Sequence, residues 1–250
     1  MNEKRRFIRT VTVTGADMSV EPEELVDIAT EYPFVEFGIL VSRNNVLGGN
    51  RFPTRMWIEK LISAKIVQDA VFDRVIQLSL HVCGSYVKEI LQQGNWAGLI
   101  TNMPNNLCWF RRIQLNTHGR VHLYDREPFS NAAKILSDRG HQIIIQIDGS
   151  NDTECILSDA KADGNNIVGL YDLSSGNGVL PQSWQSCKSF TGYSGGLSPD
   201  NVQENIEKIA QVASSEIWID AETHLRSNND AQFDVEKVKK FLENVKPYVI

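Results

Sequence analysis

The stretch Phe190-Thr-Gly-Tyr-Ser-Gly-Gly-Leu-Ser-Pro-Asp-Asn-Val202 contains a β-prone run, then a pair of glycines, then a helix-start signal. Phe190 to Tyr193 favours an extended strand, because β-branched and aromatic side chains fit a pleated surface. Ser198-Pro-Asp-Asn is typical of a first helical turn, where proline and short polar residues are preferred. A strand that leads directly into a helix is the repeating unit of an α/β fold.

The same unit recurs along the whole chain. Short apolar and β-branched runs are each followed by a polar or glycine-containing loop and then by a stretch with helical periodicity. There are eight runs: Arg9 to Thr14, Phe34 to Leu40, Val75 to Leu80, Arg112 to Leu115, Ile143 to Ile147, Ile167 to Tyr171, Phe190 to Tyr193 and Ile217 to Ile219. Strands that are apolar on both faces and alternate with helices predict a parallel sheet wrapped in helices. Eight such units predict a closed (β/α)8 TIM barrel.

Helix-start signals between the runs support this architecture. Helices are predicted to begin near Glu21, Pro53 and Ser198, and the last is predicted to span Asp234 to Val245. The rival architecture is an open doubly wound sheet, but no Gly-x-Gly-x-x-Gly follows the first strand to favour it. No linker or low-complexity tract divides the chain. We therefore expect residues 1–250 to form a single domain.

Composition and charge exclude several classes of function. The 250 residues are 42% hydrophobic and 22% charged, and the formal net charge of -6 argues against nucleic acid or an anionic membrane as a partner. Neither a signal peptide nor a membrane span is predicted. Four scattered cysteines without a CxxC pair argue against a zinc ribbon or a disulfide framework. We expect a cytoplasmic monomer or homodimer, with a small phosphorylated molecule as its partner and no cofactor or metal.

The candidate functional residues follow the ends of the predicted strands, because TIM barrels carry their chemistry there. They are Thr14 and Asp17; Ser42, Arg43, Arg51 and Arg55; His81 and Cys83; Asn116 and His118; Asp148; Asp172, Ser174 and Ser175; Ser194, Gly195 and Gly196; Asp220, Glu222, Thr223 and Arg226. The turn at Gly195 and Gly196 predicts an anion site. Glycines let the main chain approach a ligand, and a helix N-terminus offers unpaired N–H groups.

This turn resembles the phosphate-binding turn of the phosphoribosylanthranilate isomerases, typically Gly-Gly-Leu-x-Pro-x-Asn-Val, which matches from Gly195 to Val202. Gln114-Leu-Asn-Thr-His-Gly is similar to that family's Gln-Leu-His-Gly after strand four, with two residues inserted. Leu170-Tyr-Asp-Leu-Ser-Ser-Gly and Ile219-Asp-Ala-Glu-Thr-His-Leu-Arg resemble its strand-six and strand-eight segments. The resemblance covers most of the chain and is strong at strand seven.

The resemblance implies an isomerase-like enzyme that acts on a phosphorylated sugar or sugar-amine by acid–base catalysis. In that family an acid protonates the ring oxygen of a ribosylamine, and a base removes the proton at the second carbon. The resemblance makes Asp172 the acid. It also places Thr14 where the family has its catalytic cysteine, so Cys83, after strand three, is our candidate for the missing thiolate.

The groups expected to hold the substrate lie on both sides of the site. The phosphate is expected to bind Ser194, Gly195, Gly196, Thr223 and Arg226, of which Arg226 would compensate for His224 at a family glycine position. Arg43, Arg51 and Arg55 cluster around a glycine-containing loop that would cover the site and meet a substrate carboxylate. Asn116 and Asp148 are further candidate substrate contacts at strand ends.

Two other functions remain open from the sequence. A metal-assisted epimerase or hydrolase would use His81, Asp148, Asp172 and Asp220, which come from four different strand ends. A barrel that binds a phosphorylated sugar without turning it over also fits the absence of the expected cysteine. His118 and His122 have no carboxylate nearby in a recognised metal motif.

Overall fold

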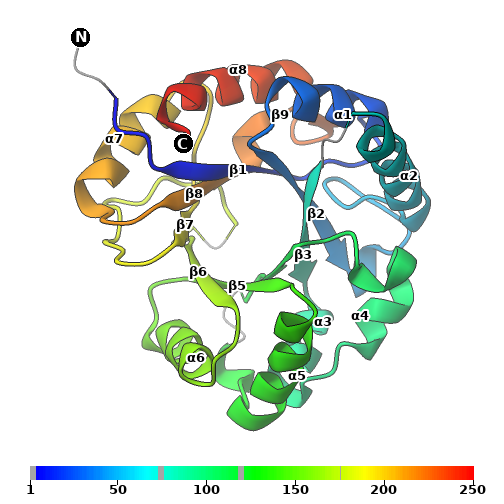
Figure 1. Cartoon of the computed structure of the whole chain (residues 1–250), viewed down its shortest axis with the longest axis vertical. Helices are drawn as coiled ribbons and strands as arrows, with labels where there is room; N and C mark the ends of the chain where they lie inside the picture. The colour runs from blue at the N-terminus through cyan, green and yellow to red at the C-terminus, as the bar shows by residue number, and fades with distance from the viewer. Residues whose placement is uncertain (1–3, 73–75, 118–120, 175) are drawn as a thin grey trace.

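The computed structural model describes residues 4–72, 76–117, 121–174 and 176–250, and a closed barrel of parallel strands forms its centre (Figure 1). The strands are β1 (Ile8–Thr14), β2 (Val35–Ser42), β3 (Gln77–Cys83), β4 (Arg112–Leu115), β5 (Gln142–Ile147), β6 (Ile167–Tyr171), β7 (Thr191–Tyr193) and β8 (Ile217–Ala221). Neighbouring strands follow chain order, and β8 closes the barrel by pairing with β1, with Ile219 opposite Val11. The predicted TIM barrel is confirmed.

Helices form the outer ring of the barrel (Figure 1). They are α1 (Pro22–Glu31), α2 (Arg55–Phe72), α3 (Ser85–Gln93), α4 (Ala97–Asn102), α5 (Arg126–Asp138), α6 (Asn151–Ala162), α7 (Val202–Val212) and α8 (Val235–Val245). A small antiparallel pair, β9 (Arg226–Ser227) and β10 (Gln232–Phe233), precedes α8. At the start of α8, Asp234 accepts a hydrogen bond from the amide of Lys237 at 3.0 Å, which caps the helix as its sequence predicts.

The inside of the barrel is only partly apolar. Ile144, Val168, Leu170 and Trp218 form a small buried cluster there, and Phe190 packs against it. A buried ion pair lies beside this cluster: Arg112 Nη1 is 3.3 Å from Glu36 Oε1, and the guanidinium lies over the Trp218 ring at 4.1 Å. Burying a polar group costs free energy unless the group is paired. The barrel interior therefore contains a paired polar layer as well as an apolar one.

One repeat departs from the predicted alternation of strand and helix. The connection from β6 to β7, residues 172–190, contains no helix in its described part. Gly176, Gly178 and Pro181 fall in this stretch, and glycine and proline are the poorest helix formers. Residues 172–190, which we call the covering loop, fold back over the carboxyl end of the barrel. There His224 Nε2 lies 2.9 Å from the Gly178 carbonyl oxygen.

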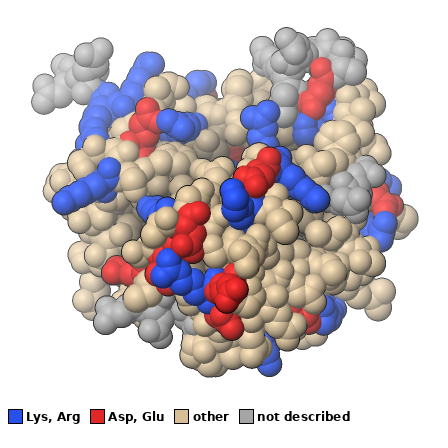
Figure 2. All heavy atoms as spheres, turned by 60° about the horizontal axis from the view of Figure 1, so that its bottom comes forward, with Lys and Arg blue, Asp and Glu red and all other residues tan. Residues whose placement is uncertain are grey.

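The outer surface carries charges of both signs. Figure 2 shows Lys and Arg side chains lying beside Asp and Glu side chains over one face of the molecule. Between α5 and α6, for example, Arg126 pairs with Asp159 at 3.1 Å and with Asp163 at 2.8 Å. No helix among the described residues is long and apolar enough to cross a membrane.

Candidate active site

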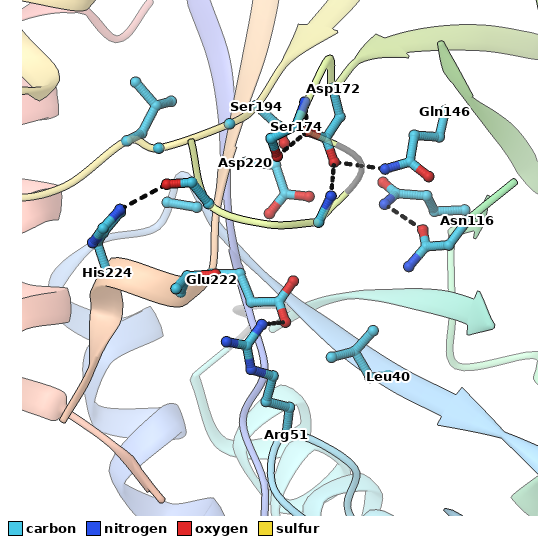
Figure 3. A pocket seen from close by; sticks show the side chains of 18 of the residues that line it. Leu40, Arg51, Asn116, Gln146, Asp172, Ser174, Ser194, Asp220, Glu222 and His224 are labelled. Atoms are coloured by element: carbon cyan, nitrogen blue, oxygen red, sulfur yellow. Dashed lines mark hydrogen bonds and ion pairs between the residues drawn. The ribbon is translucent and has the colours of Figure 1, made fainter. Parts of the chain in front are cut away.

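A cavity of about 220 Å³ opens at the carboxyl end of the barrel, where a TIM barrel is expected to carry its site (Figure 3). Three carboxyl groups line it, from Asp172, Asp220 and Glu222. The carboxamides of Gln114, Asn116 and Gln146 line the wall formed by β4 and β5. The remaining wall comes from the loop after β2, the covering loop and the turns after β7 and β8.

Asp220, near the end of β8, presents a buried carboxyl group to the cavity. Asp220 is 6% exposed, and Thr14 Oγ1 on the neighbouring β1 donates a hydrogen bond to Asp220 Oδ1 at 2.7 Å. Burial raises the pKa of Asp220 well above its usual value, and the charges of Glu222 and Asp172 add to the rise, while the Thr14 hydrogen bond opposes it. A carboxyl group in this setting keeps its proton to a higher pH than an exposed one, and it can then donate that proton.

Thr14 has a structural reason to be small and polar. Its Oγ1 lies 3.5 Å from His81 Nδ1, and the two side chains meet above Gly38 of β2. A Cβ atom at Gly38 would lie 2.3 Å from Thr14 Oγ1 and 2.8 Å from His81 Cε1, so only glycine fits. Burial lowers the pKa of His81 to about 3, with a further contribution from the Arg112 charge, so this imidazole is neutral near pH 7. Thr14 therefore contacts both the Asp220 carboxyl group and the neutral His81 ring.

Asp172 follows β6 directly and is 5% exposed. Its Oδ2 accepts hydrogen bonds from Gln146 Nε2 at 2.6 Å and from the Gly176 amide at 3.1 Å. Its Oδ1 accepts two more from Ser174, from the amide at 3.1 Å and from Oγ at 2.6 Å. These four donors fix the carboxylate and the start of the covering loop. With its oxygens engaged as acceptors, Asp172 is poorly arranged to give a proton to a substrate.

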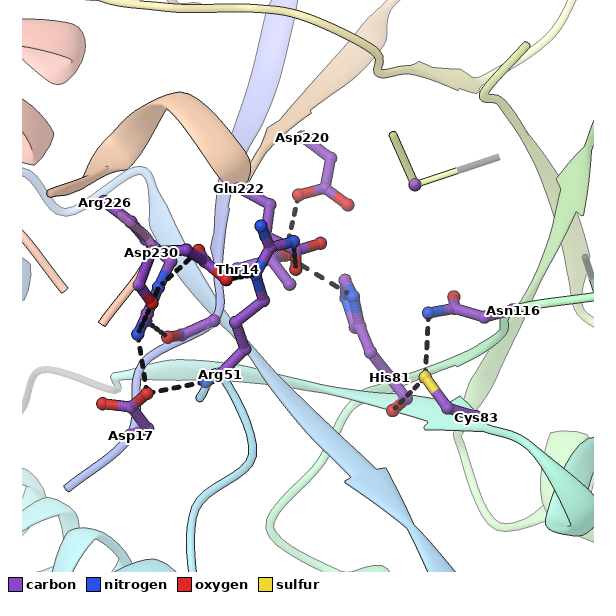
Figure 4. A network of polar contacts seen from close by, with 12 residues as sticks. Thr14, Asp17, Arg51, His81, Cys83, Asn116, Asp220, Glu222, Arg226 and Asp230 are labelled. Carbon is purple, nitrogen blue, oxygen red and sulfur yellow. Dashed lines mark hydrogen bonds and ion pairs between the residues drawn. The ribbon is translucent and has the colours of Figure 1, made fainter. Parts of the chain in front are cut away.

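A chain of alternating charges closes one side of the cavity (Figure 4). Arg51, from the loop after β2, donates to Glu222 Oε1 at 2.6 Å and to Asp230 Oδ2 at 2.7 Å. The Arg51 amide donates to Asp17 Oδ2 at 2.7 Å, which holds the residue at a φ of 71° that only a few per cent of non-glycine residues adopt. Burial raises the pKa of Glu222, Asp230 and Asp172 add to the rise, and Arg51 opposes it.

Arg226 belongs to this charged network, and the structure does not bring it to the cavity wall. Its side chain is 0% exposed and lies 2.8 Å from Asp17 Oδ2 and 3.0 Å from Asp230 Oδ1. It also donates to the Gly15 carbonyl oxygen. The expectation that Arg226 holds a phosphate does not fit this placement, because partners within the chain already occupy its donors and no ligand can reach it.

The turn after β7 lies at the cavity wall. The predicted phosphate contacts that line the cavity are Ser194, Gly195, Gly196 and Thr223. Gly195 and Gly196 have φ values of 105° and 66°, which favour glycine. Asn201 braces the turn, since its Nδ2 donates to the Gly196 carbonyl oxygen at 2.9 Å. The amides of residues 195–197 donate no hydrogen bond to any other described residue. The main chain of the covering loop also packs here, because a Cβ at Gly196 would lie 2.4 Å from the Leu180 nitrogen.

Cys83 and Asn116, predicted as base and substrate contact, both line the cavity. Asn116 Nδ2 is 3.2 Å from Cys83 Sγ, and Asn116 Oδ1 accepts from Gln114 Nε2 at 2.9 Å. The thiol is therefore within reach of a ligand in the same cavity as Asp220.

Arg43, Arg55 and Asp148 do not line the cavity, contrary to the substrate-binding role expected for them. Arg43 forms two hydrogen bonds with Glu89, at 2.6 and 2.8 Å, and Arg55 pairs with Glu59 at 2.9 Å. Asp148 accepts from the Ser150 amide at 3.0 Å, beside the start of α6. Ion pairs with neighbouring glutamates engage the two arginines, and a turn before α6 engages Asp148.

The four side chains considered for a metal site are not brought together. Asp172 and Asp220 line the cavity, whereas His81 lies beneath it and Asp148 lies at α6. Among the residues that the structure describes, no group of three or more His, Cys, Asp or Glu side chains is placed to hold a metal ion. His118 and Ser175 lie outside the described residues.

Of the cavity residues, Gln146 was not expected from the sequence, and Arg51 was expected only as one of three arginines on the same loop. Gln146 is a polar residue inside an apolar run. Every second residue of a barrel strand faces inward, so a polar residue in such a run could have indicated a group inside the barrel. Arg51 was grouped with Arg43 and Arg55, yet it alone reaches β8. No local signal separates the three arginines, because the choice depends on where Glu222 and Asp230 lie.

Comparison with known proteins supports the fold. Neither a protein-family model nor a curated protein matches the chain. Phosphoribosyl anthranilate isomerase from Thermotoga maritima is 13% identical, with a TM-score of 0.52 over 96% of this chain and 99% of that one. Phospho-2-dehydro-3-deoxyheptonate aldolase from Thermotoga maritima is 11% identical, with a TM-score of 0.53 over 98% of this chain and 69% of that one. Ribulose-1,5-bisphosphate carboxylase/oxygenase from Pyrococcus horikoshii is 12% identical, with a TM-score of 0.50 over 96% of this chain and 57% of that one. At these identities the likeness shows a TIM barrel.

Proposed function

We propose that this protein is an isomerase-like enzyme that acts on a phosphorylated sugar or sugar-amine by acid–base catalysis. The observation that carries the proposal is the carboxyl group of Asp220, which is buried at the cavity and oriented by Thr14 at 2.7 Å. Sugar isomerisation needs a group that gives a proton to an oxygen and a group that takes one from the neighbouring carbon. A carboxyl group with a raised pKa suits the first task near neutral pH.

Asp220 suits the acid role better than Asp172, which the family resemblance selects. Asp172 accepts four hydrogen bonds and anchors the covering loop. From the described residues Asp220 accepts one, from Thr14. We therefore assign proton donation to Asp220 and the positioning of Gln146 and the covering loop to Asp172.

Glu222 is the base that this arrangement favours. It lies two residues beyond Asp220 and faces the same cavity (Figure 3). Burial raises the pKa of Glu222, which makes its carboxylate a stronger base, and Arg51 holds one of its oxygens at 2.6 Å. A sugar between the two groups would receive a proton on oxygen from Asp220 and lose one from carbon to Glu222. Cys83 remains the second candidate for the base, because its thiol lines the same cavity.

The phosphate end of the substrate is assigned to the turn after β7. The unpaired amides of residues 195–197 and the side chains of Ser194 and Thr223 offer hydrogen-bond donors. Main-chain amides can bind a phosphate without an adjacent cation, so the proposal does not need Arg226. The three similar barrels are named for compounds that carry phosphate, which agrees with this assignment.

Hydrogen exchange at the second carbon of the sugar tests the proposal directly. The protein is incubated in D2O with a panel of phosphorylated aldoses and amino sugars, and loss of the carbon-two proton is followed by NMR. We expect exchange with at least one compound, and a reduction of about 100-fold or more in Asp220→Asn. Asp138→Asn, at a 65% exposed side chain on α5, is the control and should match the wild type. Unchanged exchange in Asp220→Asn would refute the assignment, and binding without exchange would favour the non-catalytic barrel.

A further inference from the structure

We infer that the acidic part of the cavity binds a protonated amino group, so that the substrate is a phosphorylated amino sugar whose nitrogen carries no other substituent. This inference rests on the proposed function and narrows its substrate class. It concerns the wall formed by Gln146, Asp172, Asp220 and Glu222 (Figure 3).

The charges of the described cavity lining are unbalanced toward acid. Asp172, Asp220 and Glu222 contribute carboxyl groups, and Arg51 is the only lysine or arginine among the lining residues that the structure describes. The Arg51 guanidinium already donates to Glu222 and Asp230. A substrate carboxylate at this wall would meet like charges and no available cation. The cavity therefore disfavours the carboxylate-bearing substrate for which Arg43 and Arg55 were expected to serve.

Gln146 supplies a separate observation that points to a hydrogen-bond donor. The residue is 3% exposed and lines the cavity. Its Nε2 donates to Asp172 Oδ2 at 2.6 Å, which fixes the orientation of the amide because a carboxylate cannot pair with the carbonyl side. Its Oε1 is buried and has no hydrogen-bond partner among the residues that the structure describes. A buried acceptor without a donor is costly, so a ligand that brings an N–H group here removes that cost.

An ammonium group fits these acceptors better than a hydroxyl group does. It has three donors and no acceptor, whereas a hydroxyl has one donor and lone pairs that would face the carboxyl oxygens. Its positive charge also offsets the repulsion between the Asp172 and Glu222 carboxylates. Hydrogen bonds from a charged donor are about twice as strong as neutral ones. The wall therefore selects for a primary amine.

Paired sugar phosphates test this selection without requiring turnover. Isothermal titration compares 2-amino-2-deoxyglucose 6-phosphate with glucose 6-phosphate, and the N-acetylated amine serves as an uncharged control. We expect the amine to bind about tenfold tighter or better than the other two. Equal or weaker binding of the amine would overturn the inference and would leave the phosphate assignment standing.

Gln146→Met is the matching variant, because methionine is similar in size and has no amide. It should bring the affinity ratio of amine to alcohol close to one. Gln142→Met, at the other end of the same strand, is the control and should keep the wild-type ratio. An unchanged ratio in a folded Gln146→Met protein would contradict the role of this amide.

Failure of the phosphate site is distinguishable from failure of this inference. If neither phosphorylated compound binds, glucosamine and glucose are titrated at higher concentration. A preference for glucosamine that Gln146→Met removes would support the amine site while rejecting the phosphate assignment. No preference in this pair would overturn the amine site.

Discussion

Removing the buried charge of Glu36 tests whether the polar interior of the barrel is held by an ion pair. Glu36 Oε1 lies 3.3 Å from Arg112 Nη1 and accepts from Thr12 Oγ1 at 2.9 Å, and the Glu36 and Arg112 side chains are 1% and 10% exposed. Glu36→Gln keeps the size and the Thr12 hydrogen bond, and it leaves the guanidinium without its counter-charge.

The expected cost follows from that burial. Breaking a buried ion pair by removing one partner costs about 3–5 kcal/mol, because the remaining charge is left uncompensated. The Trp218 ring, 4.1 Å from the guanidinium, keeps part of the stabilisation of Arg112. We therefore expect Glu36→Gln to lower the free energy of unfolding by about 3 kcal/mol, toward the lower end of this range.

Urea unfolding at pH 7 measures this cost, and the chain offers a matched control. Glu216 pairs with Arg9 on the surface, where the side chains are 44% and 60% exposed, so Glu216→Gln should cost less than about 1 kcal/mol. The double variant Glu36→Leu/Arg112→Met should be more stable than Glu36→Gln, because it leaves no unpaired charge. A Glu36→Gln cost as small as that of Glu216→Gln would mean that Glu36 and Arg112 are not an ion pair in the folded protein.

Three further predictions follow from the site. The raised pKa of Asp220 means that the folded protein keeps a proton that the unfolded chain releases above about pH 4, so this group lowers stability as the pH rises. Thermal melts should therefore give Asp220→Asn a higher melting temperature than the wild type at pH 8, and a similar one at pH 4. Cys83→Ser should change deuterium exchange by less than about tenfold, and a loss of a hundredfold or more would make the thiol the base. Arg226→Met should lose about 3–5 kcal/mol of stability because Asp17 is left uncompensated, and selective loss of phosphate affinity at normal stability would instead restore its predicted ligand role.

The strands were predictable because a closed parallel barrel needs apolar runs. The predicted run from Ile167 to Tyr171 matches β6, and Arg112 to Leu115 matches β4. The third run was expected to begin at Val75, which lies outside the described residues, and β3 itself begins at Gln77. The cavity position followed from the fold, since strand ends converge at one face of a barrel.

The partners of individual side chains were not predictable, because they depend on contacts between distant segments. Arg226 resembles an exposed loop arginine in the sequence, but the path of β9 buries it against Asp17, 209 residues away in the chain. The covering loop has no helix signal, and nothing local indicates that it folds over the turn after β7. The choice between Asp172 and Asp220 as acid depends on burial and hydrogen bonding, which two similar strand-end aspartates do not reveal.

A crystal structure with glucose 6-phosphate would show whether the cavity has a phosphate end and an acidic end. We expect phosphate oxygens at about 2.7–3.2 Å from the amides of residues 195–197, with the sugar extending toward Asp220 and Glu222. A phosphate bound elsewhere on the molecule, without contact to those amides, would contradict this assignment.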